Sequence, residues 1–275
     1  MTNHNKVEKD ISYPDTGNDL CFEVEDKSFW FRHRNDCILE LLKQFPPGSV
    51  FFDIGGGNGY VAKALEDNGF RTTLVQPGKA GINNAIKRGL KNVINSRLED
   101  LDIPSHSLSA IGLFDVLEHI KNPNAFLEII SRFLTTDGRL YISLPAFNFL
   151  WSYEDVFAGH FTRFSLKTSK KMLIENGYTI EYATYIFSFL PFLIFLSRTF
   201  PYWLGVGKKE IGKKNNKILN DHTELKKNGI LNKLIHSIFQ KELKFIHKKK
   251  KMPIGSTCLL IARKNAVSIT GKTQC

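Results

Sequence analysis

One glycine-rich stretch constrains the fold of this chain more than any other part of it. Two apolar residues lead into Asp53, and four glycines follow within six positions: Gly55, Gly56, Gly57 and Gly59. The residues after them have a helical pattern. The stretch therefore predicts a buried strand, a turn too tight for side chains and a helix, an arrangement in which a ligand contacts bare backbone. The alternative is that the glycines serve only the close packing of the helix.

Apolar runs and helical patterns alternate along the next part of the chain. Strands are predicted at residues 50–54, 72–75, 92–94, 109–114, 139–144, 178–185 and 256–262. Helices are predicted at residues 22–45, 61–68, 81–88, 124–134, 165–176 and 229–245. Alternation of this kind predicts an α/β fold with right-handed βαβ units and a parallel, doubly wound sheet covered on both faces.

The charge of the chain is unevenly distributed. The net charge is +11, but residues 198–275 hold 18 Lys and Arg against 4 Asp and Glu, which leaves −3 on the first 197 residues. The basic part is either a solvated lysine face or a surface that meets an anionic partner, with membrane phosphates favoured over nucleic acid. The four cysteines form no CxxC pair, and we expect neither a disulfide framework nor a metal site. The polar N-terminus predicts a cytoplasmic protein, without a secretory signal.

A run of 16 residues without charge, 182-YATYIFSFLPFLIFLS-197, breaks the alternation. It is shorter than the roughly 20 apolar residues that span a bilayer. Three interpretations stay open: a helical hairpin at the membrane interface, a hydrophobic lid over a substrate cleft, or a dimer surface. The hairpin would place residues 186–217 at the cytoplasmic face of a membrane and insert its aromatic side chains into lipid: Phe187, Phe189, Phe192, Phe195, Phe200, Tyr202 and Trp203.

The position of an acid within the glycine turn bears on the ligand. In 53-DIGGGNG-59 the acid precedes the first glycine by two residues, where it would repel a pyrophosphate and suit a nucleoside that carries positive charge. Together with 114-FDVLEHIKNP-123, 144-LPAFNFLWSYEDVFAGHFTRFS-165 and 253-PIGSTCLLIARK-264, this turn resembles the class I S-adenosylmethionine-dependent methyltransferases, and more narrowly their bacterial small-molecule members. The resemblance covers residues 25–185 and 253–264 and does not specify a substrate.

The resemblance implies a Rossmann-like methyltransferase fold. Its sheet would have seven strands, six parallel and the last antiparallel, with a helical and partly apolar insertion between strands six and seven. We expect a flexible N-terminus at residues 1–20, a methyltransferase domain at 21–185 plus 253–264, and the insertion at 186–252. The cofactor would be S-adenosylmethionine, bound at the carboxyl ends of the first strands.

The resemblance also implies which residues bind the cofactor. Asp53 would orient the methionine end, and the turn backbone would lie under the methionine and ribose. The implied cofactor-binding residues are Asp53, Gly55, Gly57, Gly59, Gln76, Leu98, Phe114 and Asp115. Gln76 stands where the family has an acid for the ribose hydroxyls, and Arg97 stands where it often has one for the adenine amino group. An amide lacks the charge-assisted strength of a carboxylate, so we expect weaker cofactor binding and not its absence.

Three residues are candidates for catalysis: His119, His160 and Arg163. His160 has an intrinsic pKa suited to taking a proton from a hydroxyl, and Arg163 suits an anionic group. His119 is equally compatible with packing of its loop. An ion pair of Asp155 with Arg163 or His160 would instead make this segment a structural anchor. Glu118 is expected at the surface or at the start of a helix.

These residues predict a methyltransferase that acts by in-line displacement on a small or lipid-linked acceptor. The alternative is a non-catalytic S-adenosylmethionine-binding protein of the same fold, which Gln76 and Arg97 would favour. Nucleic acid is not expected as a partner, because the chain lacks the Asn/Asp-Pro-Pro-Tyr signature of base methylation.

Overall fold

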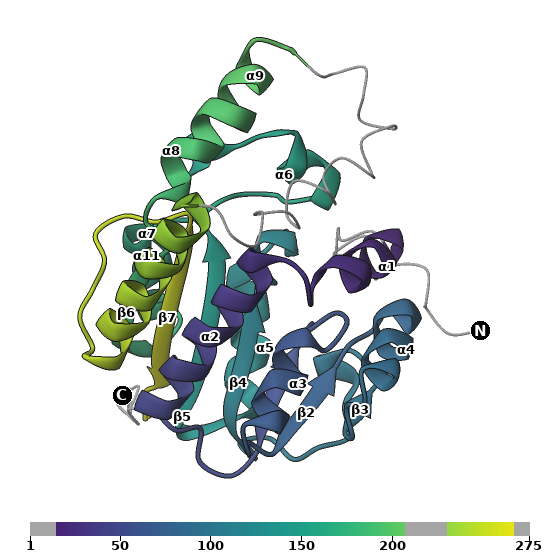
Figure 1. Cartoon of the computed structure of the whole chain (residues 1–275). Helices are drawn as coiled ribbons and strands as arrows, with labels where there is room; N and C mark the ends of the chain where they lie inside the picture. The colour runs from purple at the N-terminus through teal and green to yellow at the C-terminus, as the bar shows by residue number, and fades with distance from the viewer. Residues whose placement is uncertain (1–14, 207–229, 267–275) are drawn as a thin grey trace.

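A seven-stranded sheet forms the centre of the computed structural model, which describes residues 15–206 and 230–266 (Figure 1). The strands lie in the order β3-β2-β1-β4-β5-β7-β6. Only β7 runs antiparallel to its neighbours, β5 and β6. The strands are β1 (Phe51–Ile54), β2 (Thr72–Val75), β3 (Val93–Ile94), β4 (Leu108–Phe114), β5 (Leu134–Pro145), β6 (Tyr178–Ile186) and β7 (Thr257–Lys264). The predicted doubly wound sheet, with its antiparallel last strand, is confirmed.

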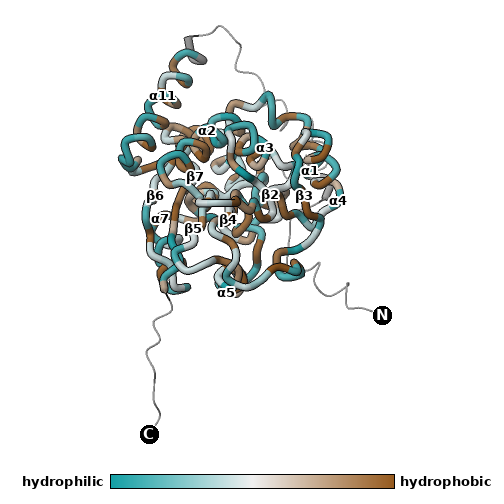
Figure 2. Tube along the Cα trace, turned by 90° about the horizontal axis from the view of Figure 1, so that it is seen from below, coloured by the Kyte–Doolittle hydropathy of each residue, from teal (hydrophilic) through white to brown (hydrophobic). Residues whose placement is uncertain are grey.

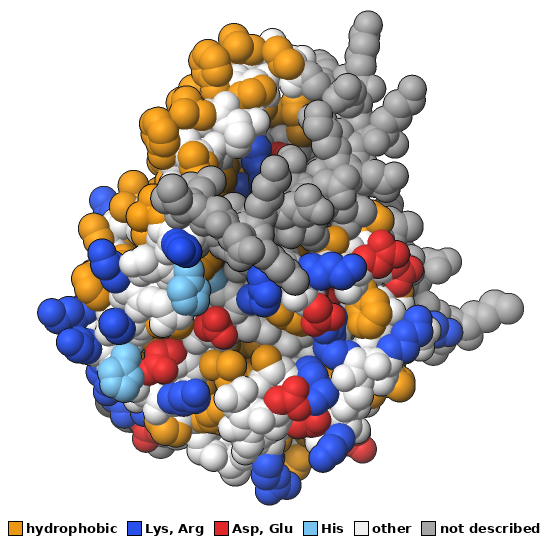
Figure 3. Space-filling model, viewed as in Figure 1, with side chains coloured by type: hydrophobic (Ala, Val, Ile, Leu, Met, Phe, Trp, Pro, Cys, Tyr) orange, Lys and Arg blue, Asp and Glu red, His pale blue; other side chains and the backbone are white. Residues whose placement is uncertain are grey.

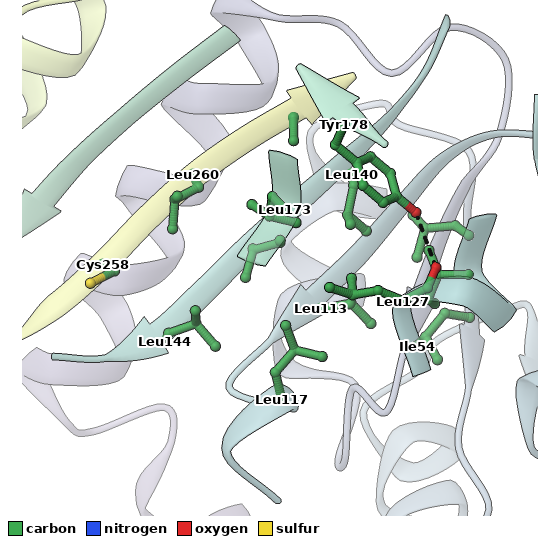
Figure 4. Packing of buried hydrophobic residues seen from close by; sticks show 14 of the residues in the cluster. Ile54, Leu113, Leu117, Leu127, Leu140, Leu144, Leu173, Tyr178, Cys258 and Leu260 are labelled. Carbon is green, nitrogen blue, oxygen red and sulfur yellow. Dashed lines mark hydrogen bonds between the residues drawn. The ribbon is translucent and has the colours of Figure 1, made fainter. Parts of the chain in front are cut away.

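Helices cover both faces of this sheet (Figure 2). One face carries α2 (Phe29–Gln44), α3 (Tyr60–Asp67), α4 (Lys79–Lys87) and α11 (Ile230–His247). The other carries α5 (Pro123–Phe133) and α7 (Leu166–Glu175). Leucine side chains of β4 and β5 meet those of α5 and α7 there, and the hydroxyl of Tyr178 donates to the Leu127 carbonyl at 3.3 Å (Figure 4). Burial on both faces explains why the central strands have apolar residues at nearly every position.

The N-terminal region differs from the prediction. The helix expected over residues 22–45 is divided into α1 (Asp15–Val24) and α2, and α2 begins where the Ser28 hydroxyl accepts a hydrogen bond from the Trp30 N–H at 3.2 Å. A serine cap of this kind starts a new helix by satisfying an otherwise unpaired N–H. Residues 15–20, expected to be flexible, belong to α1, and residues 1–14 lie outside the described part.

The segment after β6 is helical as far as it is described. It contains α8 (Leu190–Ile194), a π-helical turn (Phe195–Thr199) and α9 (Phe200–Trp203), which project beyond the sheet (Figure 1). Residues 207–229, which include much of the expected basic segment, lie outside the described part. Among the described helices, none combines the length and the apolar character needed to cross a bilayer.

The last helix, α11, packs on α2 as part of the layer that covers the sheet. The buried carboxylate of Glu242 on α11 lies 2.9 Å from the His33 imidazole on α2 and accepts hydrogen bonds from the Phe187 and Ser188 N–H groups at 2.9 and 2.7 Å. Burial by itself would raise the pKa of Glu242, but these hydrogen bonds outweigh it and lower the pKa. This helix, which lies within the insertion expected at 186–252, therefore packs as part of the core.

One aromatic residue assigned to lipid contact lies inside the protein instead, and a second is half-buried against it. Phe187 is fully buried, stacked on Trp30 with ring centroids 5.6 Å apart. Phe189 packs against Phe239 of α11 at 5.8 Å. The expectation that Phe187 enters a membrane is wrong, because β6 ends directly before it and delivers its ring to the α2–α11 layer.

Candidate active site

The glycine turn has the bare backbone that the sequence predicts. It connects β1 to α3, and Gly57 adopts a φ of +53°, a conformation that side-chain-bearing residues rarely take. A Cβ at Gly56 would lie 2.3 Å from a carboxylate oxygen of Asp53. The turn is thus closed to side chains from beneath, and its upper side faces a cavity.

This cavity has a volume of about 1020 Å³ and lies at the carboxyl ends of β1, β2, β4 and β5. Ligand pockets in proteins commonly measure roughly 300–1,000 Å³, so it can hold a nucleoside together with a second molecule. The helices α1, α6 (Tyr153–Ala158) and α8 lie beyond the strand ends (Figure 1). Nine of the predicted site residues contribute to the lining: Gly55, Gly57, Gln76, Leu98, Phe114, Asp115, His119, His160 and Arg163.

The other two predicted residues, Asp53 and Gly59, are not part of the lining. Asp53 is fully buried beneath Gly56. Burial raises the pKa of Asp53 to about 7, opposed by the charge of Arg34 and by the Ala62 N–H. Gly59 caps the start of α3, with a φ of +70°. Both residues therefore shape the turn from behind, and direct contact of Asp53 with a cofactor remains a prediction.

Gln76 reaches the turn from the end of β2. Its side-chain oxygen accepts a hydrogen bond from the Gly57 N–H at 3.2 Å. This contact places the amide at the boundary between the turn and the cavity, and contact of Gln76 with a ribose stays a prediction. Arg97 also lines the cavity, 4.0 Å from the Glu99 carboxylate. The turn, the amide and the cavity together fit S-adenosylmethionine.

An arginine that the sequence analysis did not single out lies at the centre of the site. Arg34 of α2 is buried and forms an ion pair with Asp115, whose other carboxylate oxygen accepts a hydrogen bond from Ser143 at 2.9 Å. The guanidinium also stacks on Trp30, 4.8 Å from the ring centroid. The helical spacing of Trp30 and Arg34 was the available signal, but it does not reveal a partner 81 residues away.

The helix α1 closes the other side of the turn. The side-chain nitrogen of Asn58 donates to the Asn18 carbonyl at 2.7 Å and to Glu25 at 3.2 Å. Arg88 of α4 holds Glu25 in an ion pair at 2.7 Å. Burial raises the pKa of Glu25, and the charge of Arg88 opposes that effect. The N-terminal helix is therefore fixed against the cofactor turn by polar contacts that the sequence analysis did not anticipate.

Asp155 organises the loop that follows β5. One of its oxygens lies 2.8 Å from His160 Nδ1 and accepts a hydrogen bond from Arg163 Nε at 2.7 Å, and the other accepts from the Ser152 N–H at 2.9 Å. Burial by itself would raise the pKa of Asp155, but the contacts with His160 and Arg163 hold it at about 2. Both anchoring pairs considered from the sequence are present. Nδ1 of His160 faces the carboxylate, so Nε2 is the ring atom left for the cavity.

The loop after β4 meets this segment directly. The Phe161 N–H donates to the Glu118 carbonyl at 2.8 Å, and the His119 and His160 rings lie edge to face with centroids 4.7 Å apart. Glu118 was expected at the surface, yet it is only 1% exposed. Burial and then the charge of Asp115 raise its pKa well above the usual range, while burial and then His160 lower the pKa of His119 to about 4. Two segments far apart in the sequence thus form one cluster beside the cavity.

Comparisons with known proteins agree with this geometry. The model of a family described as a methyltransferase domain matches residues 28–183, more than half of the chain. The chain belongs to this methyltransferase family. The resemblance to class I S-adenosylmethionine-dependent methyltransferases is thereby confirmed, and S-adenosylmethionine is the cofactor that the site of this methyltransferase fits.

Relatives and solved structures are distant from this methyltransferase. It is 24% identical over 133 residues to a probable S-adenosylmethionine-dependent methyltransferase of Mycolicibacterium smegmatis, covering 48% of this chain and 51% of that one. It is 27% identical over 117 residues to a ubiquinone biosynthesis O-methyltransferase of Xylella fastidiosa, covering 40% of this chain and 48% of that one. The matches thus span about half the length of these relatives. A solved methyltransferase of Thermotoga maritima, described as a possible histamine N-methyltransferase, aligns with a TM-score of 0.57 at 15% identity over 91% of this chain and 96% of that one, which supports the fold alone.

Proposed function

We propose that the protein transfers a methyl group from S-adenosylmethionine to a hydroxyl oxygen of a small acceptor that carries an apolar tail. One observation carries this proposal: a single cavity joins the bare glycine turn to the buried cluster of Glu118, His119 and His160. A cofactor on the turn and an acceptor at the cluster would share this cavity. Such an arrangement is what an in-line displacement requires.

The acceptor side of the cavity has the groups that a hydroxyl acceptor needs. S-adenosylmethionine supplies an activated methyl group, so the protein has only to position the acceptor and remove its proton. Asp155 orients the His160 ring through Nδ1, which leaves Nε2 to receive that proton. Arg163 donates hydrogen bonds to Asp155 and to the Ala146 carbonyl, at 2.7 and 3.2 Å. We assign it to holding the loop in place, with one face of its guanidinium directed toward the acceptor. The relative named for O-methylation in ubiquinone biosynthesis favours oxygen as the accepting atom.

The apolar tail of the acceptor is inferred from α8 and the π-helical turn after it. Leu190, Leu193 and Ile194 line the cavity on one side of this segment. Phe192 of α8 is 68% exposed, and Trp203 at the end of α9 is 59% exposed. Hydrophobic side chains gather on the surface over α8 and α9 (Figure 3). One short segment therefore forms a wall of the cavity and also presents apolar side chains outward. This dual placement suits an acceptor whose polar end reaches the cluster while its tail leaves along α8.

The outward apolar surface of α8 and α9 fits a membrane interface in the same proposal. The basic character of the chain after residue 198 is complementary to anionic lipid headgroups. We therefore assign the protein a peripheral position at the cytoplasmic face of a membrane. A lid without lipid contact and a dimer surface are the competing assignments.

Replacement of the exposed apolar side chains tests this assignment. We expect the variant Phe192→Ser/Trp203→Ser to lose most of its sedimentation with liposomes that contain anionic lipid at low salt, because it removes interfacial aromatic area. The matched control is Phe149→Ser, which removes an exposed aromatic residue outside α8 and α9. If the unaltered protein does not sediment, the membrane assignment fails, and a change in oligomeric state in the double variant would identify a dimer surface instead.

A non-catalytic cofactor-binding protein is the alternative. It is favoured by Gln76 and Arg97, which stand at positions where the family has acidic residues. Methyl-labelled S-adenosylmethionine distinguishes the two. We expect incubation of the protein with this cofactor and a cell extract to label the lipid phase, at a hydroxyl group that becomes a methyl ether. Label in neither the lipid nor the aqueous phase, with cofactor binding intact, would establish the non-catalytic alternative.

A further inference from the structure

Three side chains beside the cavity have the composition of a metal site. Glu118, His119 and His160 each offer one ligand atom, and these atoms all lie within 4.8 Å of one another. Neighbouring ligands of a tetrahedrally bound transition metal are roughly 3.4 Å apart, given metal–ligand bonds of about 2.1 Å. A movement of each donor atom by up to roughly 0.8 Å toward the centre of the cluster would bring the three to binding distance.

Glu118 provides an independent indication that this cluster takes a ligand. Its carboxyl group is almost completely buried, and its Oε2 atom has no hydrogen-bond partner among the residues that the structure describes. A buried carboxyl oxygen left without a partner carries a cost of about 1–3 kcal/mol, which a bound cation at the cluster would remove.

The contact of His160 with Asp155 completes the pattern. Asp155 holds the Nδ1 side of the ring at 2.8 Å and so leaves Nε2 as the ligand atom, the carboxylate–histidine arrangement common behind metal-bound imidazoles. The hydrogen bond from the Phe161 N–H to the Glu118 carbonyl fixes the two loops relative to each other. The sequence did not indicate the site, because His160 lies 41 positions beyond His119 and only the fold brings them together.

We propose that Glu118, His119 and His160 bind a divalent transition-metal cation at the acceptor end of the cavity. Two imidazoles with one carboxylate are typical of zinc, manganese and iron(II) and not of magnesium or calcium, which take oxygen ligands. Three protein ligands leave coordination positions open toward the cavity, where the acceptor oxygen can bind. This revises the expectation that the chain has no metal site.

The cation also gives His160 a different task, and this consequence rests on the proposed function. With Nε2 bound to the metal, the ring no longer receives the proton, and the metal lowers the pKa of the acceptor hydroxyl instead. The O–H bond breaks and its proton leaves to water. The oxygen then forms the bond to the methyl carbon, and the electron pair of the breaking C–S bond remains on sulfur as the thioether of S-adenosylhomocysteine.

Cobalt(II) and manganese(II), added alone to the full chain after treatment with a chelator, test the site without any need for activity. We expect one Co²⁺ per chain with the visible absorption of a nitrogen- and oxygen-ligated site, and a loss of affinity of at least about 100-fold in Glu118→Gln and in His160→Gln. Glu118→Gln keeps the size of the side chain, so a stable fold is expected. His236→Gln, which removes an exposed imidazole of α11 outside the cavity lining, is the matched control and should bind as the unaltered protein does.

Two results would overturn the metal site. The first is that neither cation binds, and the second is that Glu118→Gln binds as tightly as the His236→Gln control, which would place the ion elsewhere. Methyl transfer separates this inference from the function on which its role depends. Transfer that continues at an unchanged rate in the metal-free protein rejects the catalytic role of the cation and leaves His160 as the base. Cobalt binding at the cluster without transfer to any acceptor, under every metal condition, rejects the methyltransferase proposal and keeps the site.

Discussion

Replacing Gly57 with valine is expected to weaken the binding of S-adenosylhomocysteine by at least about 100-fold, a loss of roughly 2.7 kcal/mol. Gly57 has a φ of +53° and lines the cavity, so a branched side chain would both strain the turn and occupy the space where the cofactor meets the backbone. It would also disturb the 3.2 Å hydrogen bond from the Gly57 N–H to Gln76. Calorimetric titration of the variant measures the change.

Gly69→Val is the matched control for backbone strain. Gly69 follows α3 with a φ of +85°, and among the described residues other than its chain neighbours none lies within 4 Å of the position that its Cβ would take. Each of the two variants should lose about 1–2 kcal/mol in the free energy of unfolding, the cost of a left-handed backbone for a residue with a side chain. Only the Gly57 variant should lose cofactor affinity. Equal affinities in both would show that the turn does not contact the cofactor.

Replacing His160 with glutamine is expected to lower the rate of methyl transfer by about 10²–10⁴-fold, the range typical for loss of a positioned acid–base group. The amide of glutamine neither takes up the proton of a hydroxyl nor binds a metal as imidazole does. Because His160 lies on the acceptor side of the cavity, the affinity for S-adenosylhomocysteine should change by less than about threefold. Steady-state rates at saturating cofactor, together with calorimetry, separate the two quantities.

The control for this variant is again His236→Gln, which should have the rate and the affinity of the unaltered protein. A parallel fall in rate and cofactor affinity in His160→Gln would make His160 a structural residue. In that case its role would be confined to the loop anchored by Asp155 and Arg163, whose contacts with one carboxylate oxygen are the strongest polar feature of that segment.

Much of the fold could be predicted because each strand and helix is indicated by a pattern of residues that are neighbours in the sequence. The strand at Thr72–Val75 was predicted to the residue, and most others differ by one or two positions at their ends. The exception is β5, which begins at Leu134 and not at the predicted residue 139. Alternating strands and helices of this length leave few topologies that are right-handed and buried on both faces. The glycine turn was equally readable, because positive φ angles and close approach select glycine from the sequence alone.

Contacts between distant segments could not be predicted in this way. The ion pair of Arg34 with Asp115 and the burial of Glu118 depend on how α2 and the loop after α6 meet the end of β4. The sequence around Phe187 is as apolar as the sequence around an aromatic residue at a membrane interface. Only the packing of α11 shows that Phe187 belongs to the core. The spacing of residues in the sequence indicates which face of one helix or strand is buried. These sites are assembled from residues of several helices, strands and loops.

A crystal structure of the full chain grown with S-adenosylhomocysteine tests the central claim most directly. The account predicts the nucleoside in the cavity, with its ribose beside Gln76, its methionine part against the backbone of residues 55–57 and its sulfur directed toward Glu118, His119 and His160. A ligand bound elsewhere, or a cavity in which side chains fill the space above Gly57 at saturating ligand, would contradict it.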